Sequence, residues 1–215
     1  MYNLPYHKAE NEREISDFIK GHPFAFISGC DSNNRPIATQ IPVFIEEKGI
    51  RKTLIGHMMK NTDHHKAFLN NENILVVFSG KHTYISGTWY SNPHTPSTWN
   101  YMSVHAKGTI RFLEDDALKD VLRKTSLYFE ENNTDSTTVY DNLPFAFKEK
   151  ILPAIVAFEI EIHEIDSVFK LSQDRDESSY QNIIKKLRQQ GQDAQEIATE
   201  MEKRAKKLFP GSKEL

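Results

Sequence analysis

The stretch that decides the fold covers residues 73–112 and reads NILVVFSGKHTYISGTWYSNPHTPSTWNYMSVHAKGTIRF. It contains both tryptophans of the chain, and its second half alternates with a period of two residues. One set of alternate positions is apolar, namely Met102, Val104, Ala106, Ile110 and Phe112. The intervening positions are aromatic, polar or cationic, namely Trp99, Tyr101, Ser103, His105, Lys107 and Arg111. Successive side chains of a strand point to opposite faces, so this pattern predicts a half-buried strand.

The outer face of this predicted strand has two explanations. Large aromatic rings beside an imidazole and cations suit a flat polar ligand or a partner subunit. Aromatic cross-strand pairs also stabilise sheets without binding anything. The residues alone leave both explanations open.

Three further strands are predicted before this stretch, and short turns join them. Residues 24–28, 36–45 and 53–58 are rich in β-forming side chains, and turn-forming residues separate them at 29–34 and 46–49. The links are too short for helical crossovers, so we expect an antiparallel meander. Pro42 cannot donate a ladder hydrogen bond, which predicts an edge strand or a bulge at that position.

A candidate phosphate cradle follows the third strand. Lys60, Asn61, Thr62 and Asp63 precede a short predicted helix over residues 64–69, which Asn61 or Thr62 can cap. Free backbone N–H groups and the helix dipole attract an anion to such an N-terminus. Many capped helices with a nearby lysine bind nothing, so the motif alone does not decide the matter.

The remainder of the chain adds helices and one long strand. Helices are predicted over residues 115–129, 142–152, 180–190 and 193–208. Residues 155–162 alternate, with Val156, Phe158, Ile160 and Ile162 inward and Ala157, Glu159, Glu161 and His163 outward. This order of elements predicts a mainly β, α+β fold. We expect a closed or nearly closed antiparallel barrel, because closure removes open sheet edges.

Composition and motifs exclude several classes of protein. A net charge of −3, from 27 basic and 30 acidic residues, does not indicate a general nucleic-acid binder. No apolar run has the length of a membrane span. The single cysteine, Cys30, and an N-terminus without signal-peptide features point to a cytoplasmic protein.

Motifs for particular chemistries are equally scarce. Neither a Rossmann fingerprint nor a P-loop, a nucleophile elbow or a zinc-protease motif is found in the sequence. His57, His82 and His105, each on a different predicted strand, are the best candidates for metal ligands. A polar ligand explains these histidines equally well, so we predict no metal site.

The chain resembles the PaiB family of FMN-binding negative transcriptional regulators across nearly all of its length. The resemblance rests on several motifs taken together: Met1-Tyr2 with Pro5, residues 35–42, Gly56-His57, residues 76–80 with His82, 84–86, Trp89-Tyr90, 98–101, Val104-His105 with Gly108, and 170–173 with Arg175. It implies a flavin-reductase-like split β-barrel of the FMN-binding type. It further implies a homodimer with FMN in a groove between the two barrels, and negative control of protease and sporulation genes by direct or indirect action on DNA.

The resemblance also implies which residues form the site. The flavin ring would lie along Ala38, Thr39 and Gln40, and the phosphate would lie at His57, Lys60, Asn61 and Thr62. The remaining groove residues would be His82, Tyr84, Trp99, Tyr101 and His105, with Lys170 and Gln173 closing it. We expect a split-barrel domain with inserted helices at 1–172 and a C-terminal helical extension at 173–215. The resemblance assigns no catalytic residue.

The chain departs from the family pattern beside the expected phosphate. Where the family usually has Asn-Pro and then Trp, this chain has Thr62-Asp63-His64-His65, which adds a negative charge. Two alternative functions therefore stay open. One is an enzyme, either a flavin-dependent oxidoreductase or a haem-related oxygenase, although no general acid or base stands out. The other is a cofactor-free dimeric interaction protein that uses the 99–105 face as its interface.

Overall fold

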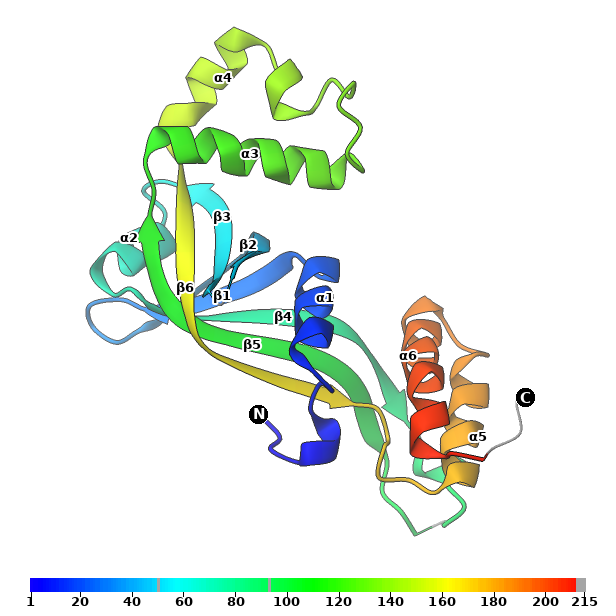
Figure 1. The fold of residues 1–215 in the computed structure, drawn as a ribbon. Coiled ribbons are helices and arrows are strands. Elements are labelled where there is room, and N and C mark those ends of the chain that lie inside the picture. Colours follow the sequence, from blue (N-terminus) through cyan, green and yellow to red (C-terminus); the bar gives the residue numbers. More distant parts are fainter. Residues whose placement is uncertain (50, 93, 212–215) are drawn as a thin grey trace. The chain divides into compact units, whose positions relative to one another are not determined.

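The computed structural model describes residues 1–49, 51–92 and 94–211, and they form two compact units. The terminal unit comprises Met1–Ile15, Ser79–Val104 and the chain from Asp166 onward. The barrel unit comprises Ser16–Phe78 and His105–Ile165. Six strands close into a barrel in the order β1-β2-β3-β6-β5-β4 (Figure 1). Strand β2 pairs antiparallel with β1 and β3, as do β1 with β4 and β3 with β6, so the predicted α+β barrel fold is confirmed.

The strands and helices have the following bounds. The strands are β1 (Phe24–Cys30), β2 (Pro36–Lys48), β3 (Arg51–Met59), β4 (Asn73–Ile85), β5 (Thr98–Phe112) and β6 (Ile155–Lys170). The α-helices are α1 (Glu12–Gly21), α2 (Asp63–Asn70), α3 (Asp115–Phe129), α4 (Phe145–Ile151), α5 (Glu177–Leu187) and α6 (Gln192–Leu208). Short 3-10 turns lie at Pro5–His7, Gly87–Trp89, Tyr140–Asn142 and Leu152–Ala154.

Local sequence signals explain where most helices begin. Thr62 caps α2, as predicted, and Asp176 caps α5, which therefore starts three residues before the predicted Tyr180. The predicted helix over 142–152 is shorter than expected, because α4 begins only at Phe145. Pro144 disfavours helical geometry at the preceding Leu143, whose ψ is 142°.

Pro42 was predicted to mark an edge strand or a bulge, and the described pairings leave one edge of its segment without a strand partner. As a whole strand β2 lies between β1 and β3, but within the described pairings it pairs with β1 along 36–42 and with β3 only along 43–48. Pro42 stands at the change of partner, opposite Phe24. The missing N–H is tolerated there because the ladder with β3 starts only at the next residue, Val43.

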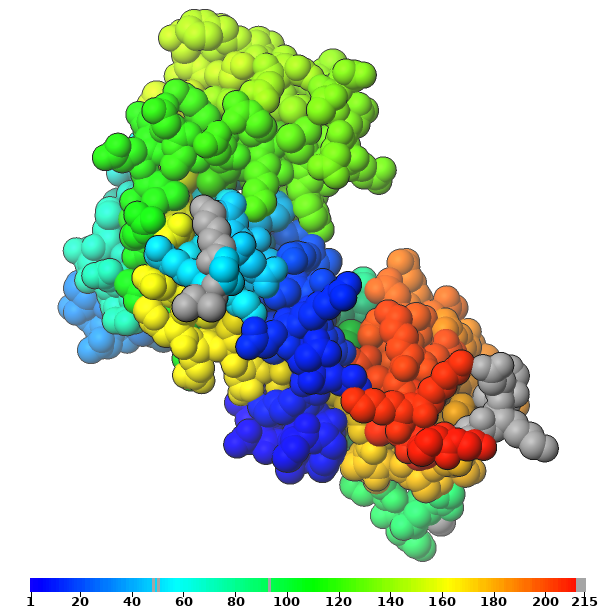
Figure 2. Space-filling model, in the orientation of Figure 1, coloured from blue at the N-terminus to red at the C-terminus, as the bar shows by residue number. Residues whose placement is uncertain are grey.

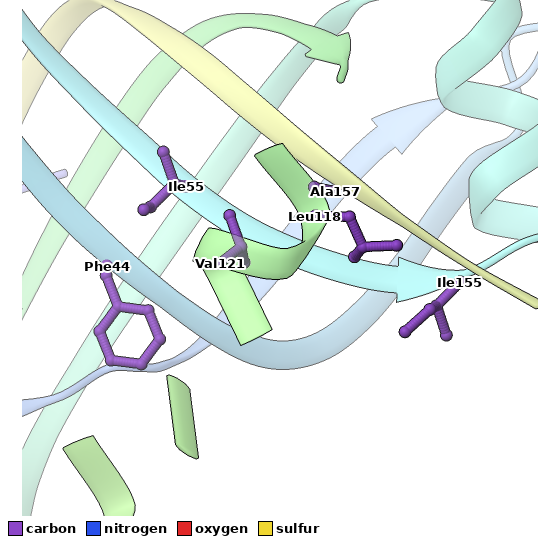
Figure 3. Close-up of a cluster of buried hydrophobic side chains, with 6 residues drawn as sticks. All are labelled: Phe44, Ile55, Leu118, Val121, Ile155 and Ala157. Carbon is purple, nitrogen blue, oxygen red and sulfur yellow. The ribbon is translucent and has the colours of Figure 1, made fainter. Parts of the chain in front are cut away.

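The core of the barrel unit explains a difference from prediction at Ala157. Ala157 was expected to point outward to solvent, but it is 0% exposed. α3 covers it, and its Leu118 and Val121 pack with Phe44, Ile55, Ile155 and Ala157 (Figure 3). A hydrogen bond from the Leu113 N–H to the Ala157 carbonyl, 2.9 Å, ties the start of this helical segment to β6. The inserted helix α3 therefore covers part of the barrel sheet.

The terminal unit contains the two C-terminal helices, which pack against each other. The hydroxyl of the fully buried Tyr180 in α5 donates to the Met201 carbonyl of α6 at 2.9 Å. Asn100 of β5 is also fully buried, and its side-chain carbonyl accepts from the Ser172 hydroxyl at 3.0 Å. The predicted boundary between 172 and 173 stays a prediction. Within the described ranges, none of the helices has the length and apolar character needed to cross a membrane.

Candidate functional site

The strands β2 and β3 part in the middle of the barrel unit. Their ladder runs from Lys48↔Arg51 to Val43↔Gly56 and ends there. Beyond that point, β3 continues along β6 through the pair Met59↔Ile155. Among the described pairings, residues 36–42 of β2 continue only along β1. The two strands thus form the walls of a split whose apex lies at Val43 and Gly56.

Gly56 is required at this apex because no side chain fits there. A Cβ built on Gly56 would lie 2.6 Å from the Phe158 ring and 2.9 Å from the Pro42 carbonyl oxygen. Both distances are shorter than real Cβ contacts, and the second one involves backbone. The close approach of β2, β3 and β6 at this point therefore depends on glycine.

The β2 wall carries the residues predicted to lie beside a flavin ring. Ala38 and Gln40 are exposed, and Thr39 is half-buried. Because β1 occupies only one edge of this segment, backbone N–H and C=O groups along the other edge lack a strand partner within the described pairings. Such an edge can pair with the polar rim of a heterocycle, as it would with another strand.

The β3 wall ends in His57 and Lys60. The Nδ1 atom of His57 is buried and has no hydrogen-bond partner, and burial lowers the pKa of this imidazole. A buried polar atom without a partner is uncommon and marks a position where a ligand can complete the hydrogen bonding. Lys60 follows three residues later, and its N–H donates to the Ala154 carbonyl at 2.8 Å.

The start of α2 is preorganised but already carries a negative charge. Asn61 adopts a positive φ of 66°, and the Thr62 hydroxyl accepts from the His65 N–H at 3.3 Å. The Asp63 carboxylate accepts from the His64 N–H at 2.7 Å, which lowers the pKa of Asp63. An exposed carboxylate therefore sits where the predicted phosphate would be bound. The cation of Lys60 and the unpartnered His57 fit a phosphate, and Asp63 opposes it.

The terminal unit brings together a second group of predicted residues. The ring of Trp99 lies 5.9 Å from His82 and 6.0 Å from Tyr84, measured between ring centroids. Trp99 is 51% exposed and Tyr84 48%, so both rings are available to a flat ligand. The Lys170 ammonium donates to the Trp99 carbonyl at 2.9 Å and to the Thr98 hydroxyl.

Two other predicted residues of the terminal unit have more restricted surroundings. Tyr101 is half-buried, and burial raises the pKa of its phenol. The Gln173 amide is engaged locally, since it accepts from the Leu171 N–H at 2.7 Å and donates to the Phe169 carbonyl. Gln173 therefore closes a turn of its own chain.

The predicted site residues thus form two groups. The barrel unit holds Ala38, Thr39, Gln40, His57, Lys60, Asn61, Thr62 and the half-buried His105, and the terminal unit holds His82, Tyr84, Trp99, Tyr101, Lys170 and Gln173. In the part of the chain that the structure describes, no three His, Cys, Asp or Glu side chains are placed to hold a metal ion. The assignment of all these residues to one cofactor stays a prediction.

Sequence reasoning missed a cavity beside Lys60. Its volume is about 380 Å³, and its walls are Lys60, Asp115, Leu118, Lys119, Leu152 and Pro153. The sequence predicted a helix that begins at Asp115 but gave no sign that this helix returns to the end of β3. No local signal could have shown it, because the contact joins segments far apart in the chain.

The chain is similar to several known proteins. Residues 1–164 match the family model described as "Putative FMN-binding domain". The Bacillus subtilis "Protease synthase and sporulation protein PAI 2" is 34% identical over 208 residues, which cover 96% of this chain and 99% of that protein.

Solved structures show the same fold at low identity. The FAD and haem binding protein from Mycobacterium smegmatis has a TM-score of 0.58 at 17% identity, covering 76% of this chain and 73% of that one. The flavocytochrome Anf3 from Azotobacter vinelandii has a TM-score of 0.54 at 19% identity, covering 79% of this chain and 72% of that one.

Proposed function

This chain belongs to the PaiB family, and from that membership we propose that it is an FMN-binding split-barrel protein that acts as a negative regulator of transcription. The observation that carries the flavin part is the split between β2 and β3 with Gly56 at its apex. On one wall, backbone groups at 38–40 face the ring. At the other, Lys60 and His57 serve the phosphate.

The proposed cofactor would supply the redox and light-absorbing chemistry, while the chain's own residues bind and orient it. Lys60 contributes a cation, and the neutral His57 can donate one hydrogen bond. The aromatic residues Tyr84 and Trp99 offer ring faces for stacking.

We propose that the protein forms a homodimer, in which a second copy covers an exposed apolar face of β1. Phe24 and Phe26 are 60% and 40% exposed, and they pair with Pro42 and Gln40 on the proposed ring wall. Large exposed phenylalanines are uncommon on a monomer and are typical of interfaces. Phe26→Glu should give a monomer by light scattering and weaken FMN binding. A dimer of unchanged affinity would contradict this arrangement.

Regulation by this protein is proposed to be indirect, through a protein partner. The basic residues at the end of α6 are already paired: Lys203 and Arg204 with Glu200, and Lys207 with Glu10. Paired cations release few counterions and give little affinity for DNA. We expect no gel shift of a protease-gene promoter at low salt. A sequence-specific shift would overturn the indirect mechanism.

The flavin part is tested by titration of FMN with purified protein, followed by flavin fluorescence. Lys60→Ala should weaken FMN binding about tenfold, since a charge-assisted contact to phosphate is lost. Lys66→Ala changes an exposed lysine on α2, the helix that follows Lys60, and is the matched control that should have no effect. Equal affinities of both variants, or no saturable signal in the unmodified protein, would contradict the proposal.

A further inference from the structure

The cavity beside Lys60 is built by the inserted helices of the barrel unit. The end of β3 supplies Lys60, the first turns of α3 supply Asp115, Leu118 and Lys119, and the turn before β6 supplies Leu152 and Pro153. The hydrogen bond from the Lys60 N–H to the Ala154 carbonyl holds the end of β3 against that turn. Figure 2 shows the insertion, green to yellow-green, as a lobe of its own with an open outer surface. A volume of about 380 Å³ is within the range of small-molecule sites.

The lining of this cavity combines charge with an apolar wall. Lys60 and Lys119 contribute two ammonium groups, and Asp115 contributes one carboxylate. The Lys119 ammonium contacts Asp116 at 2.9 Å, but Asp116 is almost fully exposed, so this pair costs little to exchange. Leu118, Leu152 and Pro153 form the apolar part. Such a lining suits an anionic ligand with a flat apolar portion.

We infer that this cavity receives the adenylate half of FAD, so that the flavin site accepts a dinucleotide as well as FMN. The inference rests on the proposed flavin site, because Lys60 belongs both to the phosphate end of that site and to the cavity wall. A flavin phosphate at Lys60 would direct any further substituent into this cavity, whose wall Lys60 also forms.

Five of the lining residues would contact the dinucleotide. Lys119 and Lys60 together neutralise a diphosphate, which carries more charge than the single phosphate of FMN. The Asp115 carboxylate accepts hydrogen bonds only, and the ribose hydroxyls of an adenylate are suitable donors. Leu152 and Pro153 cover the adenine ring. Lys119 therefore distinguishes the two flavins, whereas Lys60 serves both.

The test compares FMN, FAD and ADP as probes of the full-length protein. Flavin affinities are measured by fluorescence titration, and ADP is tested as a competitor of FAD. Lys119→Glu reverses one charge in the wall of the cavity, at a residue of α3 that is exposed to solvent. Lys150→Glu makes the same charge change on α4, at an exposed position outside the cavity, and is the matched control. Circular dichroism verifies that both variants are folded.

We expect FAD to bind at least as tightly as FMN, and Lys119→Glu to weaken FAD about tenfold while FMN changes less than about twofold. ADP should compete with FAD in the unmodified protein and lose this ability in Lys119→Glu. An identical ratio of FAD to FMN affinity in all three proteins would overturn the inference and leave the FMN site intact. Binding of FAD and ADP without FMN would overturn the proposed cofactor instead, and binding of none of them would overturn both.

Discussion

The helices α2 and α5 both start with a capping side chain, Thr62 and Asp176, but the surroundings of the two caps differ. At α5, the Asp176 carboxylate accepts from the Ser179 N–H at 2.9 Å, the Ser179 hydroxyl at 2.7 Å and the Ser91 hydroxyl at 2.8 Å. At α2, Thr62 accepts one long hydrogen bond, and Asp63 is 74% exposed.

The difference shows which helix start is available to a ligand. The Asp176 carboxylate satisfies one backbone donor of α5 and two hydroxyl donors, and its negative charge occupies the place that an external anion would take. At the start of α2 the Thr62 hydrogen bond is long, and the negative charge comes from an exposed side chain that hydrogen-bonds only to the neighbouring His64 among the described contacts. The first terminus serves stability, and the second remains open to binding.

The largest effect on stability is expected when the Asp176 cap of α5 is removed. Asp176→Ala removes all three hydrogen bonds and should lower the free energy of unfolding by about 2 kcal/mol, the upper end for N-caps. Urea unfolding measures this change. FMN affinity of the folded variant should be unaltered, and a parallel loss of FMN binding would break the contrast between the two termini.

Acid should weaken the same cap. The hydrogen bonds from Ser179 and Ser91 lower the pKa of Asp176 from an ordinary 3.8 to about 2. A carboxyl with a depressed pKa in the folded state stabilises above the unfolded value and loses this contribution as the pH falls through the folded value. The unmodified protein should have a higher free energy of unfolding than Asp176→Asn above pH 4. This difference should decrease between pH 4 and pH 2, by about 1 kcal/mol after solvent screening. A constant difference across this window would show that the charge is unimportant.

Removal of the negative charge at the open terminus should strengthen flavin binding. Asp63→Asn keeps the size and the acceptor oxygen but removes repulsion toward a phosphate at Lys60. We expect FMN to bind about threefold to tenfold more tightly in low salt, with the gain reduced at high salt. Isothermal titration calorimetry at two ionic strengths measures it. An unchanged affinity would mean that the phosphate lies elsewhere.

The smallest effect is expected at the α2 cap itself. The Thr62 bond to the His65 N–H is 3.3 Å long, so Thr62→Ala should cost only about 0.5 kcal/mol, the low end for caps. Thermal unfolding of Thr62→Ala beside Thr62→Ser tests it, since serine retains the acceptor. A loss as large as that of Asp176→Ala would mean that the two termini are equally closed.

Local patterns were sufficient to predict most of the elements. The Thr62 cap follows from residue chemistry within one turn, and the apolar face predicted for β5 is buried at Met102, Val104 and Ala106. The predicted outer face is wrong at Ser103, which is only 7% exposed. The family motifs led to the FMN-binding family. These signals are short in range, and their physical causes lie within a few neighbouring residues.

Features that depend on distant segments were not predictable. Ala157 is buried because α3 packs on it, and β2 changes its partner from β1 to β3 directly after Pro42. The approach of Lys119 to Lys60 depends on the same docking of α3. Each of these facts is a matter of tertiary packing, which side-chain periodicity in one segment does not encode.

The pairing of β3 with β6 has a consequence for synthesis of the protein. β3 follows β2 closely in the sequence, so the two strands can form a hairpin early. The other edge of β3 pairs with residues 155–161, which are synthesised roughly a hundred positions later. During translation this edge carries unpaired backbone groups on an apolar strand, which is a template for aggregation. Production of the protein should therefore benefit from slower translation or lower temperature, and truncation before β6 should give insoluble chains.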